Sequence, residues 1–374
     1  MRKVLILTND FPPRAGGIQS FVHALAMRLP VGSVTVYAPA WHGAAEFDAS
    51  LPFPVVRHPT SLMLPIPSVA RRAAQIIERE GCDTVLFGAA APLALLGPWL
   101  RKAGARRLIA ITHGHEVGWA ALPVARNLLR RIGDSVDTVT YLGEYTRTRL
   151  ARALSPSAVD RMARLAPGVD VAEFHPGNGG GAVRDRLGLG QRPVVVCVSR
   201  LVPRKGQDTL IRAWPQVRVV SRDAVLLLVG DGPYRDGLRR LARKLGVADS
   251  VIFAGAVPRA DLPAYYDAGD VFAMPCRTRR RGLDVEGLGI VYLEASATGL
   301  PVIGGDSGNA PDTIREGETG YVVPAGSVSV LAERLARLVT DPAAARVMGE
   351  KGVAWVHSEW RWDLVANRLQ EILA

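Results

Sequence analysis

Short runs of apolar, often β-branched residues alternate with longer helical segments along most of the chain. In the first half these runs are VLILT (4–8), VTVYA (34–38), DTVLFGA (83–89), RLIAITHG (107–114) and DTVTYLG (137–143). Strands that are apolar on both faces are typical of parallel sheets with helices on each side. The pattern therefore predicts an α/β fold built on a doubly wound parallel sheet.

The alternation stops at residues 164–193, a Gly- and Pro-rich polar stretch, and then starts again. The second half contains the runs VVVCVS (194–199), AVLLLVG (224–230), SVIFAGA (250–256), DVFAMP (270–275), LPVIGG (300–305) and GYVVP (320–324). A break of this kind indicates a linker. We expect two tandem Rossmann-like domains facing each other across a cleft, over residues 1–170 and 171–357, with the C-terminal helix 358–374 joining the first domain.

Length and composition agree with two soluble domains. The chain has 374 residues, of which 48% are apolar and 22% charged, and each half is long enough to bury its own core. The longest uncharged run, Val85–Leu100, is shorter than the ~18 residues of a spanning helix. The opening MRKVLILTND has too short an apolar core for a signal peptide, so we expect a cytoplasmic location. Cys82, Cys197 and Cys276 have no paired spacing and predict neither disulfides nor a zinc site.

The charge balance favours an anionic partner. There are 46 basic and 35 acidic residues, which gives a net charge of +11. A nucleic-acid-binding protein is one alternative with such a charge, but no aromatic-studded basic stripe or recognised module supports it, and the charge is spread over both halves. We therefore expect no nucleic-acid partner.

The unusual loops all follow predicted strands. They are NDFPPRAGGIQS (9–20), HGHE (113–116), SRLVPRKGQDTL (199–210) and GDGPYRDG (230–237). Ligands of open parallel sheets bind at the carboxyl ends of the strands, where such loops lie. No G-x-G-x-x-G follows a strand and no G-x-x-x-x-G-K-[ST] occurs, which argues against a classical dehydrogenase and a P-loop NTPase. There is also no D-x-D triplet, so the sequence predicts no metal site and requires protein cations to neutralise any diphosphate.

Two glutamates, Glu286 and Glu294, flank the segment GLGIVYL. In one continuous helix they would stand roughly 12 Å apart, whereas glycosidase carboxylates lie about 5 to 9.5 Å apart. Gly287 and Gly289 instead place Glu286 on a loop and start a helix near Ile290 that carries Glu294. A helix N-terminus between two acids predicts a site for an anion.

Several motifs in register identify the family. The segments SRLVPRKG, VGDGP, EGLGIVYLEASATGLPVI and ETGYVVP resemble the C-terminal half of GT-B fold retaining glycosyltransferases of family GT4, and GGIQSFVHALA and THG resemble the N-terminal half. Within the family, NDFPPRAGGIQ, THGHEVGW and RTRRRGLDVEGLGIVYLEA are most similar to actinobacterial phosphatidylinositol mannosyltransferases that act on a monomannosylated acceptor. The resemblance implies transfer of mannose from GDP-mannose to a phosphatidylinositol mannoside with retention of configuration, without a metal or other cofactor. Another nucleotide-hexose with another lipid or soluble acceptor is the alternative.

The resemblance also implies roles for individual residues. Arg200 and Lys205 would hold the diphosphate and offset the charge of the leaving group. Glu294 would accept hydrogen bonds from the ribose, Glu286 from the donor sugar, and His113 would lie beside that sugar, with His115 as a second candidate. The catalytic set is thus His113, Arg200, Lys205 and Glu286, and the donor-binding set is Gly16, Gly17, Arg200, Lys205, Gly230, Val257, Leu288, Gly289, Ile290 and Glu294. Since these charged residues are intact, an inactive sugar-nucleotide sensor is disfavoured.

Two basic segments suggest how a lipid acceptor is reached. Arg126, Arg130 and Arg131 lie on a basic amphipathic segment, which either docks on anionic lipid or is an ordinary core-facing helix. Residues 277–281 contain four arginines, for which a solvated loop and an anionic acceptor are both open. We expect peripheral association with the inner face of the plasma membrane.

Overall fold

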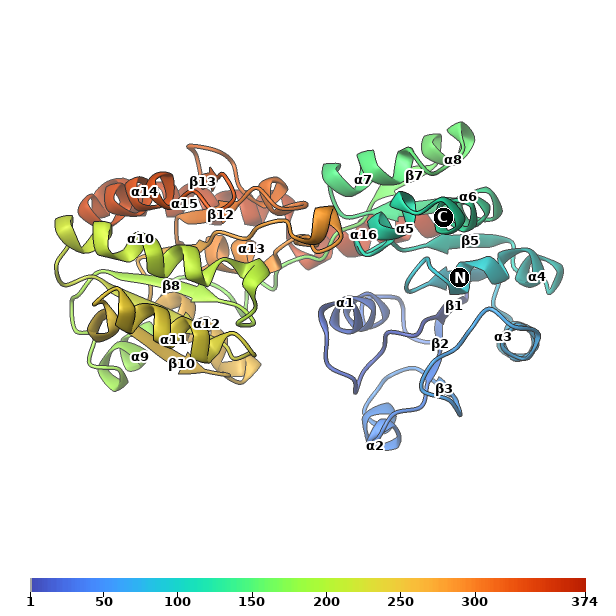
Figure 1. Cartoon of the computed structure of the whole chain (residues 1–374). Helices are drawn as coiled ribbons and strands as arrows, with labels where there is room; N and C mark the ends of the chain where they lie inside the picture. Colours follow the sequence, from blue (N-terminus) through green and yellow to red (C-terminus); the bar gives the residue numbers. More distant parts are fainter. Residues whose placement is uncertain (1) are drawn as a thin grey trace. The chain divides into compact units, whose positions relative to one another are not determined.

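The computed structural model describes residues 2–374, except for the side chain of Arg281. The chain forms two compact units, one extending to Pro167 and including Asp363–Ala374, the other comprising Gly168–Trp362. Figure 1 shows that each unit is a sheet with helices on its faces. The sequence-based boundaries were 170/171 and 357/358.

Within the described residues, the N-terminal unit has a seven-stranded parallel sheet in the order β3-β2-β1-β4-β5-β6-β7. Its strands are β1 Val4–Leu7, β2 Val34–Pro39, β3 Val55–His58, β4 Thr84–Phe87, β5 Arg107–Ala110, β6 Thr138–Tyr141 and β7 Met162–Arg164. Its helices are α1 Gly17–Ala26, α2 Ala44–Ala49, α3 Pro67–Glu80, η1 Leu93–Leu96, α4 Gly97–Lys102, α5 Glu116–Ala121, α6 Pro123–Ser135, α7 Glu144–Ala151, α8 Pro156–Asp160 and, after the second unit, α16 Trp362–Leu373.

The described part of the C-terminal unit has a six-stranded parallel sheet in the order β10-β9-β8-β11-β12-β13. Its strands are β8 Val194–Val198, β9 Val225–Val229, β10 Val251–Gly255, β11 Val271–Met274, β12 Val302–Gly305 and β13 Gly320–Val323. Its helices are α9 Gly180–Arg186, η2 Pro203–Lys205, α10 Gln207–Val220, α11 Arg235–Lys244, η3 Ala248–Ser250, η4 Arg259–Asp261, α12 Leu262–Asp267, η5 Arg280–Gly282, α13 Ile290–Ala297, η6 Ala310–Thr313, α14 Val328–Thr340 and α15 Pro342–Glu359.

The apolar runs of the sequence all become strands, so this prediction is confirmed. Two strands were missed, β3 and β7, and both lie at an outer edge of the N-terminal sheet. Every residue of β3 is partly exposed, and β7 is only three residues long. Their sequences, VVRH and MAR, each include an arginine, so they lack the continuous apolar run that identified the other strands, including the edge strands β10 and β13.

In each sheet, the direction in which successive strands are added reverses near the centre. The chain proceeds outward from β1 to β3 and then crosses back to β4, and it does the same from β8 to β10 and back to β11. The loops on either side of such a reversal separate and leave room for a ligand at the carboxyl ends of the strands. The loops after β1, β4 and β5, and those after β8 and β11, are therefore the places to examine for a site.

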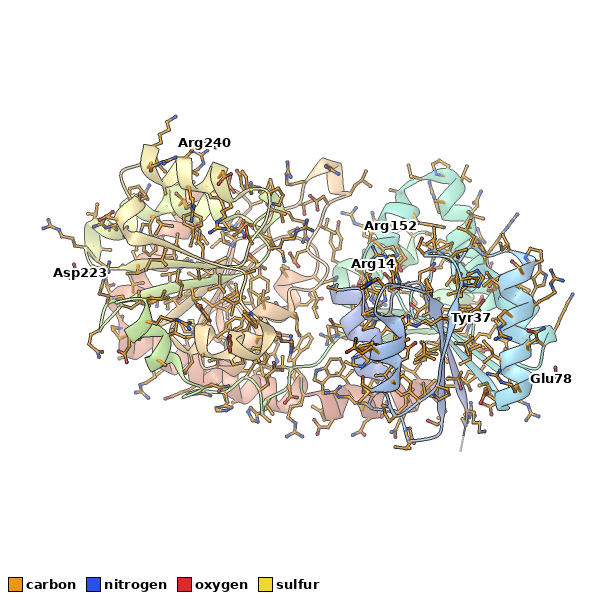
Figure 2. The ribbon with its side chains drawn as sticks, turned by 90° about the horizontal axis from the view of Figure 1, so that it is seen from below. Arg14, Tyr37, Glu78, Arg152, Asp223 and Arg240 are labelled. Atoms are coloured by element: carbon orange, nitrogen blue, oxygen red, sulfur yellow. The ribbon has the colours of Figure 1, made fainter. Side chains whose placement is uncertain are left out.

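The core of the N-terminal unit is formed where strand and helix side chains are excluded from water. Leu5, Leu7, Val85 and Phe87 are fully buried. Figure 2 shows Tyr37 of β2 inside this unit, whereas Glu78, Asp223 and Arg240 project outward from their units. The Tyr37 hydroxyl lies 2.7 Å from Nδ1 of His58 on the neighbouring strand, which gives this buried polar group a partner.

The last helix, α16, belongs to the N-terminal unit although the rest of that unit ends at Pro167. Its residues Leu369, Ile372 and Leu373 are buried. Arg2 Nη1 donates to the Leu373 carbonyl at 2.8 Å, and Arg107 Nε donates to the Ile372 carbonyl at 2.8 Å. The end of α16 is thus tied by side chains that come from the beginning of the chain and from β5.

We expect Leu369→Ala to lower the free energy of unfolding of the N-terminal unit by about 2 to 5 kcal/mol, because it leaves a cavity at a fully buried position. Gln370→Ala, on the exposed side of the same helix, should stay within about 0.5 kcal/mol of the wild type. Calorimetric unfolding measures both. Equal stability of the two variants would contradict the packing of α16 described above.

Candidate active site

The loop after β8 carries two cations toward the start of α10. Arg200 is exposed, and Lys205 lies in η2, directly before Gly206. Gly206 has a φ of +78°, and a Cβ added there would lie 2.0 Å from the Pro275 carbonyl oxygen. Only glycine fits this position, because both the backbone conformation and the close approach of the next loop exclude a side chain.

Lys205 is paired with Glu286, which lies on the loop after β11. Lys205 Nζ is 2.8 Å from Oε2 of Glu286, and Arg204 Nη1 donates to the same oxygen at 2.6 Å. Glu286 is only 6% exposed. A buried carboxylate needs such partners, since an unpaired charge in this place would be costly. The structure therefore brings together two of the predicted catalytic residues, Lys205 and Glu286, and adds Arg204.

Helix α13 begins where the sequence predicted, at Ile290, and carries Glu294 on its buried side. Gly289 is its N-cap with a φ of +82°, and a Cβ there would lie 2.4 Å from the Tyr292 ring. Leu288 is buried and precedes this cap. In the first turn of α13 the Tyr292 amide donates to the Gly289 carbonyl at 3.0 Å, and the amides of Ile290 and Val291 precede the first regular helical hydrogen bond, where an anion can bind.

Glu294 lies in a network of its own. The Tyr266 hydroxyl donates to its Oε2 at 2.8 Å, and Arg259 Nη1 lies 3.7 Å from its Oε1. Arg259 is also bound to Glu173, with 2.9 Å between Nη2 and Oε2. Burial raises the pKa of Glu294, and the hydrogen bond from Tyr266 and the charge of Arg259 oppose that shift. Tyr266 thus occupies Oε2 of Glu294, whereas Oε1 has the Arg259 guanidinium near it at the longer distance of 3.7 Å.

Gly230 and Val257 also follow strands of this sheet. Gly230 comes directly after β9, and its backbone passes so close to the Ser199 carbonyl that an added Cβ would lie 2.1 Å from that oxygen. Val257 comes shortly after β10 and is partly exposed. Both thus stand at the same edge of the sheet as Arg200.

In the arginine-rich segment, Arg277 is paired with an acid of its own unit. Arg277 makes two hydrogen bonds to the Asp208 carboxylate, at 3.0 and 2.8 Å. Arg279 and Asp284 exchange backbone hydrogen bonds of 2.9 and 3.2 Å, which close the segment into a short loop. Of the two interpretations left open for these arginines, an anionic acceptor has less support at Arg277, whose guanidinium is already paired.

The predicted residues of the N-terminal unit lie on loops after β1 and β5. Gly16 is the N-cap of α1 and Gly17 is its first residue. A side chain at Gly17 would meet nothing within 4 Å, whereas a Cβ at Gly16 would lie 2.1 Å from the Gln19 amide oxygen. Gln19 is itself held by Asp10, with 2.7 Å between Nε2 and Oδ1.

His113 is held by the neighbouring strand end. Its Nε2 lies 2.6 Å from the Gly88 carbonyl at the end of β4, and its ring meets Phe21 edge-on at 5.8 Å. His115 stacks on it, with 6.2 Å between ring centroids, and is more exposed. Burial lowers the pKa of His113, so the ring is neutral at pH 7. Because a carbonyl only accepts, we assign the proton to Nε2, which leaves Nδ1 as an acceptor.

Glu116 holds the backbone of this loop, a role that the sequence did not predict. It is completely buried, and its Oε2 accepts hydrogen bonds from the amides of His113 and Gly114 at 2.9 and 3.2 Å. Its Oε1 lies 3.3 Å from Nε2 of His115. In the sequence, only the position of an acid three residues after a strand-end histidine could have indicated this role.

The sequence analysis also assigned no site role to Arg204, Asp284 or Tyr266. Arg204 stands beside Lys205 in the sequence, but its partner Glu286 is 82 residues away, and Tyr266 is 28 residues from Glu294. Among the described residues, no group of three or more His, Cys, Asp or Glu side chains is arranged to hold a metal ion.

Family models match both halves of the chain. The model described as "Glycosyltransferase Family 4" matches residues 15–173, and the model "Glycosyl transferases group 1" matches residues 182–355. The N-terminal match includes Gly16, Gly17 and His113, and the C-terminal match includes Arg200, Lys205, Glu286 and Glu294. The predicted site residues thus all lie within glycosyltransferase domains.

Relatives similar over the whole length carry more specific names. The chain is 54% identical to the GDP-mannose-dependent alpha-(1-6)-phosphatidylinositol monomannoside mannosyltransferase of Mycolicibacterium smegmatis, with 99% of this chain and 98% of that protein covered. It is 47% identical to the GDP-mannose-dependent monoacylated alpha-(1-6)-phosphatidylinositol monomannoside mannosyltransferase of Corynebacterium glutamicum, with 100% and 98% covered.

Solved structures agree in fold. Anabaena HepE in complex with UDP superposes with a TM-score of 0.83 at 21% identity and covers 99% of both chains. Sucrose-phosphate synthase of Thermosynechococcus elongatus superposes with a TM-score of 0.79 at 22% identity and covers 100% of this chain and 98% of that one. The chain therefore belongs to glycosyltransferase family GT4 and has the GT-B fold of two Rossmann-like domains.

Proposed function

We propose that this enzyme transfers mannose from GDP-mannose to a phosphatidylinositol monomannoside acceptor, with retention of configuration. The observation that carries the proposal is the cluster at the carboxyl ends of β8 and β11, where Lys205 is paired with Glu286 and Arg200 stands exposed nearby in the chain. The names of two relatives that match over the full length specify GDP-mannose and a phosphatidylinositol monomannoside, which supports the proposal.

The donor would be held by residues of the C-terminal unit. Arg200 and Lys205 would neutralise the diphosphate, and the amides of Ile290 and Val291 at the start of α13 would bind its distal phosphate. Glu294 accepts from the ribose through Oε1, and Glu286 accepts from hydroxyls of the mannose. Gly230 and Val257 would border the base.

The reaction breaks the bond between mannose C1 and the β-phosphate oxygen, and GDP leaves. The acceptor hydroxyl oxygen forms the new bond to C1 on the same face, and its proton passes to the departing phosphate. This chain contributes the cations that stabilise negative charge on the leaving group, as a metal ion does elsewhere. Neutral His113, on the N-terminal unit, offers Nδ1 as an acceptor for a hydroxyl group.

Transfer of labelled mannose from GDP-mannose to phosphatidylinositol monomannoside tests the function directly. We expect transfer with GDP-mannose and not with UDP-glucose, and we expect it to persist in excess chelator because Arg200 and Lys205 supply the positive charge. Stabilisation against heat by GDP, compared with UDP and ADP, reports donor binding separately, since a ligand of the native state raises the melting temperature. Loss of activity in chelator that magnesium or manganese restores would contradict the metal-free proposal.

Arg200→Ala and Lys205→Ala should each reduce turnover on the order of a hundredfold, the usual effect of removing a donor to developing negative charge. Arg222→Ala, which removes an exposed cation between α10 and β9, is the matched control and should leave turnover unchanged. The melting temperature shows whether each variant is folded. Wild-type turnover in either site variant would mean that the diphosphate lies elsewhere.

We also propose that the enzyme is cytoplasmic and binds peripherally to the inner face of the plasma membrane. Across residues 2–374, no helix is long and apolar enough to cross a bilayer. In α6, Leu129 and Ile132 are buried against the N-terminal core, whereas Arg126, Arg130 and Arg131 are exposed. Leu122 and Val124, at the start of α6, are 58% and 77% exposed. One face of α6 therefore packs on the core while the other combines cations with apolar side chains.

Replacing Arg126, Arg130 and Arg131 together with Ser should weaken binding to anionic vesicles, because each basic residue near an anionic surface contributes about 1 kcal/mol. Added salt should weaken wild-type binding in the same way, and zwitterionic vesicles should bind poorly. Activity on a short-chain soluble acceptor serves as the control and should change little. If vesicle binding survives both the replacement and high salt, the exposed apolar residues Leu62, Leu64 and Ile66 become the better candidate.

A further inference from the structure

We propose that Arg204 is a positioning residue, which holds Glu286 in place when Lys205 turns to the diphosphate of the donor. This inference rests on the proposed function, because it concerns the same donor site. It starts from an unusual arrangement, in which a single carboxylate oxygen, Oε2 of Glu286, receives two cations, Arg204 at 2.6 Å and Lys205 at 2.8 Å.

Lys205 has two tasks that compete for one ammonium group. Without donor it neutralises Glu286, and with donor it must neutralise phosphate. Glu286 is nearly buried, so the departure of Lys205 would leave a carboxylate without a counter-ion if no other cation were present. Arg204 is that second cation, and Lys205 is free to contact the phosphate without leaving the acid unpaired.

The side chain of Arg204 is anchored more firmly than that of Lys205. Its Nε lies 3.0 Å from Oδ1 of Asp284 while its Nη1 contacts Glu286. A guanidinium is planar and binds two acids at fixed angles, whereas an ammonium is a single charge on a flexible chain. Arg204 therefore remains with the acids and Lys205 is the cation able to move.

Arg204 also joins the two loops that form the site. Its carbonyl accepts a hydrogen bond from the Arg277 amide at 2.8 Å, at one end of the arginine-rich segment. Its side chain contacts Asp284 and Glu286 at the other end. Arg277 is fixed in turn by the Asp208 carboxylate on α10. The turn that carries Lys205 thus sets the position of the loop that carries Glu286.

A double-mutant cycle tests whether Arg204 acts through Glu286. Arg204→Gln should reduce mannose transfer about tenfold or more in the wild-type background, and should have little further effect in the Glu286→Gln background, where the carboxylate is gone. Because Glu286 contacts the sugar, Arg204→Gln should weaken binding of GDP-mannose more than binding of GDP. Arg204→Lys keeps a charge and should recover part of the loss.

Arg218→Gln is the matched control, since Arg218 lies on α10, is also paired with an acid, Asp249 at 2.8 Å, and lies outside the site. It should leave transfer unchanged. Equal losses from Arg204→Gln in both backgrounds, or no loss at all, would overturn the proposal. If Arg204→Gln does not fold, Arg204→Lys and Asp284→Asn take its place in the cycle. Absence of mannose transfer by the wild-type enzyme would instead remove the proposed function, so the two failures are distinguishable.

Discussion

The proposed donor site depends on the pairing of charges where little water reaches them. Glu286 is almost buried, and its Oε2 is contacted by both Arg204 and Lys205. An unpaired buried carboxylate costs several kcal/mol, so these three side chains must be arranged together. The turn that places Lys205, the loop that places Glu286 and the glycine between η2 and α10 all serve that arrangement. The exposed Arg200 adds positive charge at the same edge of the sheet.

The parallel sheet explains why these groups meet. All strands of the C-terminal sheet run the same way, so the loops after β8, β9, β10 and β11 emerge at one edge. Strands β8 and β11 are neighbours in the sheet, and the loops that carry Lys205 and Glu286 follow these two strands. The two loops approach each other through their backbones at Gly206, where a side chain would collide with the Pro275 carbonyl. The chemistry comes from the loops, and their spacing comes from the sheet.

The N-terminal unit uses the same architecture with different electrostatics. Here the group at the strand end is an imidazole that burial keeps neutral. A completely buried acid, Glu116, does not make this imidazole its hydrogen-bond partner and instead fixes the backbone amides of His113 and Gly114. The loop backbone is thereby paired while the Nδ1 atom of His113 remains an acceptor. A neutral acceptor suits the hydroxyl groups of a sugar, and the cations of the C-terminal unit suit the phosphates.

The sequence alone determined the features that depend on local pattern. Apolar runs predicted the buried strands, and the two glycines near Glu286 placed a loop before a helix that starts at Ile290 and carries Glu294. It also determined the family, because its motifs are contiguous. Strands β3 and β7 escaped, because their sequences VVRH and MAR contain only two apolar residues each and an arginine. Only the tertiary structure decided which charges are paired. Nothing in the sequence distinguished Arg204 from other cations, because its partners Asp284 and Glu286 lie far along the chain. Tyr266 carried no sign of its bond to Glu294. An ion pair or a buried hydrogen bond depends on distance in space, and distance in space between remote segments is set by the packing of the sheet.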